Sequence, residues 1–503
     1  MTLINLRNVG VTLSDPLFSD INLTIAKGDR IGLVAANGSG KSTLLRAIAG
    51  DSEPTHGEIT TSRGLRVGLV CQSVPPELLA LSMYDAVLNA LDDEQAENES
   101  WRVDIVLEDL QVPADLWHKP LQTLSGGWQR IALLARTWVC EPDALLMDEP
   151  TNHLDLGRIG VLQNWLETIA HGTPLLVASH DRAFLDAVTN RTFFLRPSNS
   201  QHFSLAYSAA RQSLEERDAA AARQFEKEIG KANQLRRQAA KLKNIGINSG
   251  SDLLLTKTRQ LKERAEKIEE TARPGFNGKS SGKIRLANSG THAKALVAME
   301  ETDITVPGGR TLFRTGRLWI NRGDRVVVLG ANGTGKTQLL NRLIRSLKSE
   351  DTSIRIAPSV VPGVSDQALS QLDRFATPME AVTQSSDVGD RNARALLATS
   401  GIMIGIQEKE LPALSGGQRS RLAMLLLRLA QPNFYVLDEP TNHLDIEGQE
   451  ALEQELLEHD ISALLVSHDR AFVRNVGTRF WLIDGKRLIE IDEPETFFDS
   501  QIQ

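Results

Sequence analysis

The feature that most constrains the fold is an internal repeat, because four separate segments of the first half return in the second half. Residues 28–45 recur at 323–340, an offset of 295 residues. Three motifs follow at offsets of 290, 290 and 288: Leu-Ser-Gly-Gly at 124–127 and 414–417, Asp-Glu-Pro-Thr-Asn-His-Leu-Asp at 148–155 and 438–445, and Ser-His-Asp-Arg-Ala-Phe at 179–184 and 467–472. Because order and spacing are both kept, we expect two homologous domains, over 1–204 and 296–503, with a linker at 205–295 between them.

Each half has the pattern of an α/β domain. Short apolar runs, several of them rich in β-branched residues, end where the polar motifs begin: 30–34 and 325–329, 144–147 and 434–437, 175–178 and 463–466. Such runs are typical of buried parallel strands. In the first half, the Gly-rich segment leads into a predicted helix with apolar positions at Leu44, Leu45 and Ile48, closed by Gly50. The predicted fold class is therefore α/β for both halves.

The loops after runs 30–34 and 325–329 have the spacing of a P-loop, in which glycines let backbone N–H groups wrap phosphate oxygens at a helix N-terminus. We expect Lys41 and Lys336 to reach the terminal phosphates of a nucleoside triphosphate. Ala35 stands where the second loop has Gly330, a replacement that is tolerable if the local φ is negative and costly if it is positive. The nucleotide-binding residues predicted in these loops are Ala35, Ala36, Asn37, Gly38, Ser39, Gly40, Lys41, Ser42 and Thr43, and Gly330, Ala331, Asn332, Gly333, Thr334, Gly335, Lys336, Thr337 and Gln338.

An Asp-Glu pair ends an apolar run in each half, and a histidine follows the next run. The aspartate is in the usual position for holding Mg²⁺ together with a P-loop hydroxyl, and the glutamate can polarise the attacking water. An isolated pair, or a lone histidine, would more often be structural, but the repetition in both halves favours the functional interpretation. The predicted magnesium ligands are Ser42, Asp148, Thr337 and Asp438, and the predicted catalytic residues are Glu149, Glu439, His180 and His468.

The Leu-Ser-Gly-Gly motif opens a predicted helix in each half, and a serine with two glycines at a helix N-terminus makes a second phosphate cradle. For a single copy, a simple helix cap explains the motif equally well. Each half already has one cradle, so the second is best explained if it serves a nucleotide held by the other half. The residues predicted in this role are Ser125, Gly126, Gly127, Ser415, Gly416 and Gly417.

These motifs, in this order, resemble those of the ATP-binding cassette (ABC) ATPases, and the doubled Asp-Glu-Pro-Thr-Asn-His-Leu-Asp resembles the ABC-F proteins in particular. The resemblance covers nearly the whole chain and implies two P-loop ABC ATPase domains, joined by a helical-hairpin linker. It implies a head-to-tail sandwich with one ATP between the Lys41 loop and Ser415–Gly417, and another between the Lys336 loop and Ser125–Gly127. It also assigns Gln72 and Gln367, each 31 residues after its P-loop lysine, as metal ligands.

The resemblance implies ATP and Mg²⁺ as cofactors, but the base-contacting positions depart from the family pattern. Family members usually stack adenine on an aromatic side chain near the first strand. The corresponding stretches here offer Thr12 or Leu13 in the first half, and Val306 or Pro307 in the second. The choice between adenine and guanine therefore stays open.

The linker is the basic part of an acidic chain. Residues 205–295 contain 19 Lys and Arg against 10 Asp and Glu, whereas the rest has 37 against 54, and this asymmetry indicates a polyanionic partner. Residues 208–243 and 252–272 have helix-forming composition without proline, and 244–251 has the composition of a turn, so a helical hairpin is predicted. Residues 273–292, with Pro, Gly, Ser and Asn, are predicted to be a flexible return. A solvated spacer is the alternative to an RNA-binding hairpin.

The sequence contains no run of 18 apolar residues, no signal-peptide pattern and only two cysteines, so we expect a cytoplasmic protein without a membrane span. The family resemblance implies an ATP-hydrolysing translation factor that binds the ribosome (rRNA and tRNA) through residues 205–295, as a monomer with intramolecular domain pairing. General translation, protection against antibiotics and a stress response stay open as its purpose. The alternatives are the ATPase subunit of a transporter with a separate membrane partner, and a non-hydrolysing scaffold, which the two retained glutamates disfavour.

Overall fold

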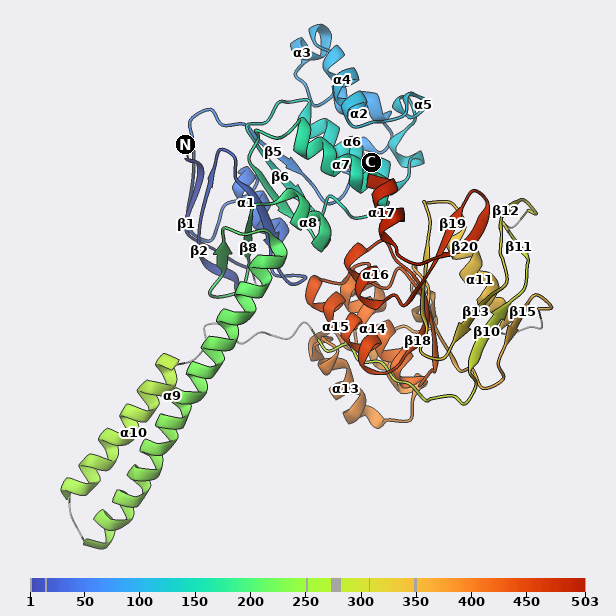
Figure 1. The fold of residues 1–503 in the computed structure, drawn as a ribbon. Helices are drawn as coiled ribbons and strands as arrows, with labels where there is room; N and C mark the ends of the chain where they lie inside the picture. Colours follow the sequence, from blue (N-terminus) through green and yellow to red (C-terminus); the bar gives the residue numbers. More distant parts are fainter. Residues whose placement is uncertain are drawn as a thin grey trace.

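The computed structural model describes residues 2–13, 16–249, 252–272, 282–306, 308–347 and 351–502. Two α/β halves lie side by side, and a long helical hairpin projects from the first half (Figure 1). The strands of the first half are β1 (Thr2–Thr12), β2 (Pro16–Ala26), β3 (Arg30–Val34), β4 (His56–Thr61), β5 (Val67–Val70), β6 (Ala144–Asp148), β7 (Leu175–Ala178), β8 (Arg191–Phe194) and β9 (Gln201–Phe203). Its helices are α1 (Lys41–Ala49), α2 (Met83–Leu88), α3 (Asp93–Asn98), α4 (Trp101–Asp109), α5 (Ala114–Trp117), α6 (Gly126–Trp138), α7 (Leu156–Thr168) and α8 (Arg182–Val188).

The second half repeats this plan. Its strands are β10 (Ala295–Met299), β11 (Asp303–Thr305), β12 (Thr311–Arg314), β13 (Leu318–Asn321), β14 (Arg325–Leu329), β15 (Ile354–Ile356), β16 (Pro362–Ser365), β17 (Phe434–Asp438), β18 (Ser462–Val466), β19 (Arg479–Asp484) and β20 (Arg487–Ile491). Its helices are α11 (Lys336–Ser346), α12 (Pro378–Ser385), α13 (Gly389–Thr399), α14 (Gly416–Leu429), α15 (Ile446–Glu458), α16 (Arg470–Val476) and α17 (Glu495–Ile502).

The central sheets of the two halves have the same strand order. In the described residues, the first sheet runs β5-β6-β7-β3-β8-β9, and the second contains the corresponding run β16-β17-β18-β14-β19-β20. The predicted strands pair in parallel, with Arg30 beside Leu175 and Arg325 beside Ala463. The α/β prediction is therefore confirmed for both halves. Because the polar motifs follow parallel strands, they meet at the same edge of each sheet.

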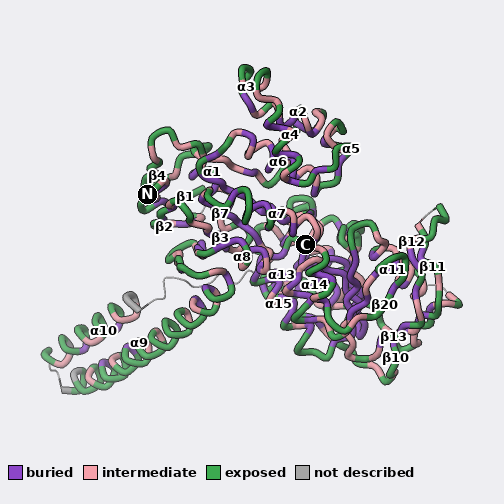
Figure 2. Tube along the Cα trace, turned by 45° about the horizontal axis from the view of Figure 1, so that its top comes forward, coloured by how far each residue is buried: buried purple, intermediate pink, exposed green. Residues whose placement is uncertain are grey.

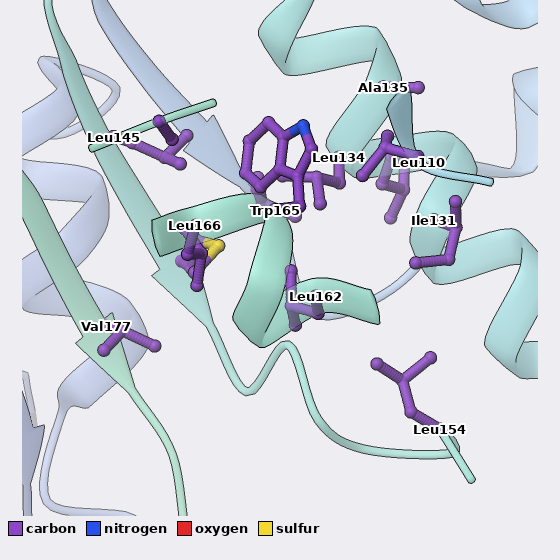
Figure 3. Packing of buried hydrophobic residues seen from close by; sticks show 14 of the residues in the cluster. Leu110, Ile131, Leu134, Ala135, Leu145, Leu154, Leu162, Trp165, Leu166 and Val177 are labelled. Carbon is purple, nitrogen blue, oxygen red and sulfur yellow. The ribbon is translucent and has the colours of Figure 1, made fainter. Parts of the chain in front are cut away.

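Separate antiparallel sheets, β2-β1-β4 and β13-β10-β15, accompany the central sheets. Behind the first central sheet, Trp165 of α7 fills the core between α6 and strands β6 and β7 (Figure 3). Its indole is 2% exposed and meets the ring of Trp138 edge-on, with 4.9 Å between centroids. This packing fixes α6, the helix that Leu-Ser-Gly-Gly opens, against the strand that ends in Asp148.

The hairpin consists of α9 (Tyr207–Ser249) and α10 (Asp252–Ala272), which pack along each other. A narrow buried strip, including Ala232, Ala239 and Ala265, lines the contact, while the outer faces are exposed (Figure 2). The predicted turn at 244–251 is wrong at its start, because α9 continues to Ser249. Gly246 does not break it, since one glycine costs only about 1 kcal/mol and the partner helix supports the contact.

The chain returns from the hairpin along the second half. Residues 273–281 of the predicted flexible return lie outside the described residues. The remainder, 282–292, is held in place: Ile284 and Leu286 are buried in the core, and the Tyr435 hydroxyl donates to the carbonyl of Ala287 over 2.6 Å. The alternation of apolar residues gives this segment a buried face despite its loop-like composition.

Candidate active site

Each P-loop ends at a helix N-terminus. Helices α1 and α11 begin at Lys41 and Lys336, and both are preceded by a glycine in the left-handed region, with φ of 94° at Gly40 and 107° at Gly335. A Cβ at Gly335 would come within 2.6 Å of Leu312 Cδ1, so both the positive φ and the limited space favour glycine there. Backbone N–H groups at such an N-terminus favour an anion. Ala35 is not among the residues with positive φ, which explains why a methyl group is tolerated in the first loop.

Lys41 lies in a buried cluster with the predicted base and histidine of its own half. The Nζ atom is 3.5 Å from Glu149 Oε1 and 2.8 Å from His180 Nε2. The backbone N–H of His180 donates to Glu149 Oε2 over 3.2 Å, and the imidazole Nε2 lies 3.1 Å from Glu149 Oε1. The three predicted residues therefore meet at the end of β6 and β7, where the terminal phosphate of a nucleotide in this P-loop would lie.

The second half has the same arrangement. The backbone N–H of His468 donates to Glu439 Oε2 over 3.2 Å, and His468 Nε2 is 3.3 Å from Glu439 Oε1. Lys336 Nζ donates to the carbonyl of Gly330 over 2.7 Å. The Thr337 hydroxyl donates to Asp438 Oδ2 over 3.0 Å, which brings together the two predicted metal ligands.

Burial dominates the protonation of these groups. It raises the pKa of Glu439 to about 7 and that of Asp438 to about 6, and it lowers the pKa of His468 to about 4. In the first half, burial likewise raises the pKa of Asp148 and lowers that of His180. The histidines are therefore neutral near pH 7, and each imidazole can donate one hydrogen bond and accept another.

The two glutamates share an unusual backbone conformation. Glu149 and Glu439 have φ of 50° and 51°, in a region that residues other than glycine seldom occupy. The Oε1 atom of each is buried, and its close neighbours are the histidine Nε2 of its own half and, for Glu149, Lys41 Nζ. Strained residues of this kind cluster at functional sites. The same backbone conformation in both halves holds a buried carboxylate oxygen beside the histidine at the end of a strand, which is where a general base would be expected to act.

The first P-loop contacts the second half directly through Asn37. Its backbone N–H donates to Asp445 Oδ2 over 3.0 Å, and its side-chain amide donates to the carbonyl of His443 over 2.8 Å. A Cβ at Gly417 would lie 2.9 Å from the Asn37 amide nitrogen, so Ser415–Gly417 is packed against the opposite P-loop. The repeat showed residues 438–445 as a motif, but sequence reasoning missed the contact between Asp445 and Asn37.

The contact between the second P-loop and the motif of the first half is looser. Asp155 lies close enough to His468 to offset part of the burial that lowers the pKa of this imidazole, but in the described part of the chain no hydrogen bond joins Asp155 to Asn332, the counterpart of Asn37. The helix caps differ too. Ser415 makes a reciprocal capping box with Gln418. In the first half Trp128 takes the place of the glutamine, and the guanidinium carbon of Arg158 lies 4.3 Å above the centroid of the Trp128 ring.

A cavity of about 1050 Å³ runs between the halves and opens onto both P-loops. Gln72 and Gln367, which follow β5 and β16, both line it, as does Ser415–Gly417. Ser125–Gly127 does not. Leu13 and Leu17 of the first half, and Val306, Arg310 and Leu312 of the second, also line the cavity; Pro307 lies outside the described residues. Among the described residues that line the cavity, no phenylalanine, tyrosine or tryptophan is found.

The donor set suits Mg²⁺ bound jointly with a nucleotide. Among the described residues, no group of three or more His, Cys, Asp or Glu side chains could hold a metal by itself. Each site instead offers one buried carboxylate beside one hydroxyl, Asp148 with Ser42 and Asp438 with Thr337. Mg²⁺ binds in this way, through one or two carboxylates together with phosphate oxygens.

Comparison with known proteins agrees with this geometry. A model of the ABC transporter family matches residues 18–152 and 314–442, more than half of the chain. The ATP-binding protein Uup of Haemophilus influenzae is 31% identical over 97% of this chain and 79% of its own, and Uup of Escherichia coli is 30% identical over 96% and 81%. ABC transporter F family member 5 of Arabidopsis thaliana is 28% identical over 93% and 72%.

Solved structures show the same fold at lower identity. An RNase-L inhibitor has a TM-score of 0.64 at 19% identity, over 99% of this chain and 92% of that one. An archaeal ribosome recycling factor in complex with a stalk protein has a TM-score of 0.65 at 19% identity, over 98% and 92%. These likenesses show the fold alone.

Tandem cassettes with paired P-loops place the chain in the ABC transporter family of ATP-binding proteins. Within it, the chain is an ABC-F protein, related along nearly its whole length to Uup and to the F family members. None of the helices formed by the described residues has the length and apolar character needed to cross a membrane.

Proposed function

We propose that the protein is an ATP-hydrolysing translation factor of the cytoplasm that binds the ribosome beside tRNA through its hairpin. In this proposal, residues 1–204 and 296–503 are the two nucleotide-binding domains, and 205–295 is the linker between them. ATP binding closes the domains on each other, and hydrolysis releases them.

The proposal assigns a role to each group around the nucleotides. Backbone N–H groups of the P-loops and of the opposite Leu-Ser-Gly-Gly segments bind phosphate, and Lys41 and Lys336 neutralise its charge. Glu149 and Glu439 accept the proton of the attacking water, while His180 and His468 orient the terminal phosphate. Mg²⁺ would be held by Ser42 with Asp148, by Thr337 with Asp438, and by Gln72 and Gln367, and it supplies charge neutralisation to the phosphates.

The observation that carries the ribosome assignment is the distribution of charge along the hairpin. We define the hairpin tip as residues 236–249 and 252–264, which contain eight Lys and Arg against two Asp and Glu. The rest of α9 and α10 contains six Lys and Arg against eight Asp and Glu. All eight basic residues of the tip are exposed, and the tip lies at the end farthest from both halves (Figure 1). A positive tip on an otherwise acidic protein suits phosphate groups of RNA.

The test uses the double variant Glu149→Gln/Glu439→Gln, which keeps the hydrogen-bonding shape of both residues but removes the base. We expect ATP turnover to fall at least about a hundredfold, and the variant to co-sediment with ribosomes in the presence of ATP. Wild-type protein with and without ATP is the control. Undiminished turnover would remove the two glutamates from their role, and co-sedimentation with membranes instead of ribosomes would favour the transporter subunit.

A further inference from the structure

Two helices occupy corresponding places in the two halves, although only one belongs to the hairpin. The base of α9 follows the last strand of the first half, and Tyr207 and Leu214 of α9 share a hydrophobic cluster with Ile446 of α15. Helix α17 follows the last strand of the second half and packs against α7 (Figure 1). In each half, the helix after the last strand therefore contacts the helix that follows Asp-Glu-Pro-Thr-Asn-His-Leu-Asp in the other half: α9 contacts α15, and α17 contacts α7.

Of these two contacts, only that of α9 with α15 includes an ion pair between the halves among the described residues. Separate ion pairs across the halves join Arg182 of α8 to Glu453 of α15 and to Asp469, and Arg470 to Asp181. Arg211 donates to Glu450 Oε2 of α15 over 2.8 Å, and their side chains are 25% and 32% exposed. Ser208, one turn earlier, donates its backbone N–H to Asp186 of α8 over 2.7 Å, which ties the base of α9 to the first half. The position of α7 that corresponds to Glu450 is Gly160, so the second half cannot make the equivalent bond.

The same helix, α15, begins at the P-loop of the first half. Asp445 caps α15 by accepting from the backbone N–H of Gly448 over 3.0 Å, and it also accepts from Asn37 of the P-loop. Arg421 of α14 holds the Asp445 carboxylate over 2.9 Å. Glu450 follows Asp445 by five positions, about 7.5 Å along the helix. A short, rigid element thus contacts the nucleotide loop at one end and the hairpin base at the other.

We propose that Arg211 and Glu450 are positioning residues for the nucleotide site built on Lys41, and that they couple this site, but not the site built on Lys336, to the hairpin. The pair adds to the contact of Arg182 with Glu453 in holding α15 at the orientation in which Asp445 meets Asn37, and it acts on the helix turn nearer to Asp445. By reciprocity, a hairpin engaged with RNA would change nucleotide affinity at the Lys41 site. The part that concerns RNA rests on the proposed function, whereas the site selectivity does not.

The test measures binding of a fluorescent ATP analogue to the full chain, one site at a time. In the Lys336→Ala background only the Lys41 site is expected to bind the analogue, and in the Lys41→Ala background only the Lys336 site. We expect Arg211→Ala to weaken binding at the Lys41 site about tenfold, the worth of one charge-assisted hydrogen bond, and to change the Lys336 site less than twofold. The exchange Arg211→Glu/Glu450→Arg should restore affinity to within about threefold of the parent.

A matched control is Arg474→Ala, which breaks the 2.8 Å ion pair with Glu495 at the base of α17. This variant is a suitable control because both partners belong to the second half. We expect it to leave both affinities unchanged. Equal losses at the two sites, no loss at either, or failure of the exchanged pair to restore affinity in a folded protein would overturn the proposal. This binding test contains no ribosome, so it stays valid even if the ribosome assignment fails.

In a second experiment, Arg211→Ala should reduce the ATP-dependent gain in ribosome affinity. An undiminished gain would overturn the coupling to the hairpin.

Discussion

Charge reversal at the hairpin tip should flatten the salt dependence of ribosome binding. The perturbation is Arg237→Glu, Lys241→Glu, Lys257→Glu and Lys262→Glu together, chosen because all four side chains are exposed and they come from both helices. Each phosphate contact contributes about 0.7 to 0.9 to the slope of log affinity against log salt. A fourfold rise in salt therefore weakens binding about 2.6- to 3.5-fold per contact, or about 50- to 150-fold for four contacts.

The assay is ribosome affinity of the variant between 50 and 200 mM salt, with ATP and in the background of Glu149→Gln/Glu439→Gln. The control reverses four charges nearer the hairpin base, Arg217, Arg223, Lys227 and Lys231, which are exposed as well. We expect the tip variant to lose its steep salt dependence and the control to keep most of it. The reasoning is refuted if the tip variant keeps the parent slope, or if the two variants lose slope equally.

Three other predictions concern the nucleotide sites and the contact between the halves. Because burial raises the pKa of Glu439 to about 7 and a base acts only when deprotonated, turnover of Glu149→Gln should fall about tenfold per pH unit below 7; a flat pH profile down to pH 5 would contradict this. Ser415→Arg should weaken binding of a fluorescent ATP analogue at the Lys41 site, and Ser125→Arg at the Lys336 site; full-rate hydrolysis by isolated 1–204 and 296–503 would exclude the shared site. Arg182→Ala leaves Glu453 buried without its cation and should cost about 3 to 5 kcal/mol in urea unfolding, whereas a loss below about 1 kcal/mol would show that the pair is not needed.

Much of the fold was predictable because the same strand and motif pattern occurs in both halves of the sequence. The segments before Asp148 and Asp438 are short continuous apolar runs, which are typical of fully buried parallel strands, and Gly50 ends α1 in the left-handed conformation expected of a glycine cap. The clusters around Glu149 and Glu439 follow from the same topology, because parallel strands deliver their polar ends to one edge.

The remaining features depend on contacts that no local pattern encodes. Asp445 and Asn37 are 408 residues apart, and their hydrogen bond exists only when the two halves face each other. The pairing of α17 with α7 and the ion pair between Arg211 and Glu450 have the same origin. The predicted end of α9 differs from the observed one for another reason: residues 244–249 have the composition of a turn, but packing against α10 favours continuation of the helix.

The central claim is that the hairpin tip lies against ribosomal RNA when ATP is bound. Replacing Lys243 by cysteine places an attachment point near the end of α9, and replacing Arg223 places a control about 30 Å nearer the base. The native thiols of Cys71 and Cys140 have pKa values raised by burial and react slowly; both are changed to serine. With an iron chelate on each new cysteine, radical cleavage of RNA should be strong from position 243 with ATP, and weak from position 223 or without ATP. Equal cleavage from the two positions, or none from position 243, would contradict the account.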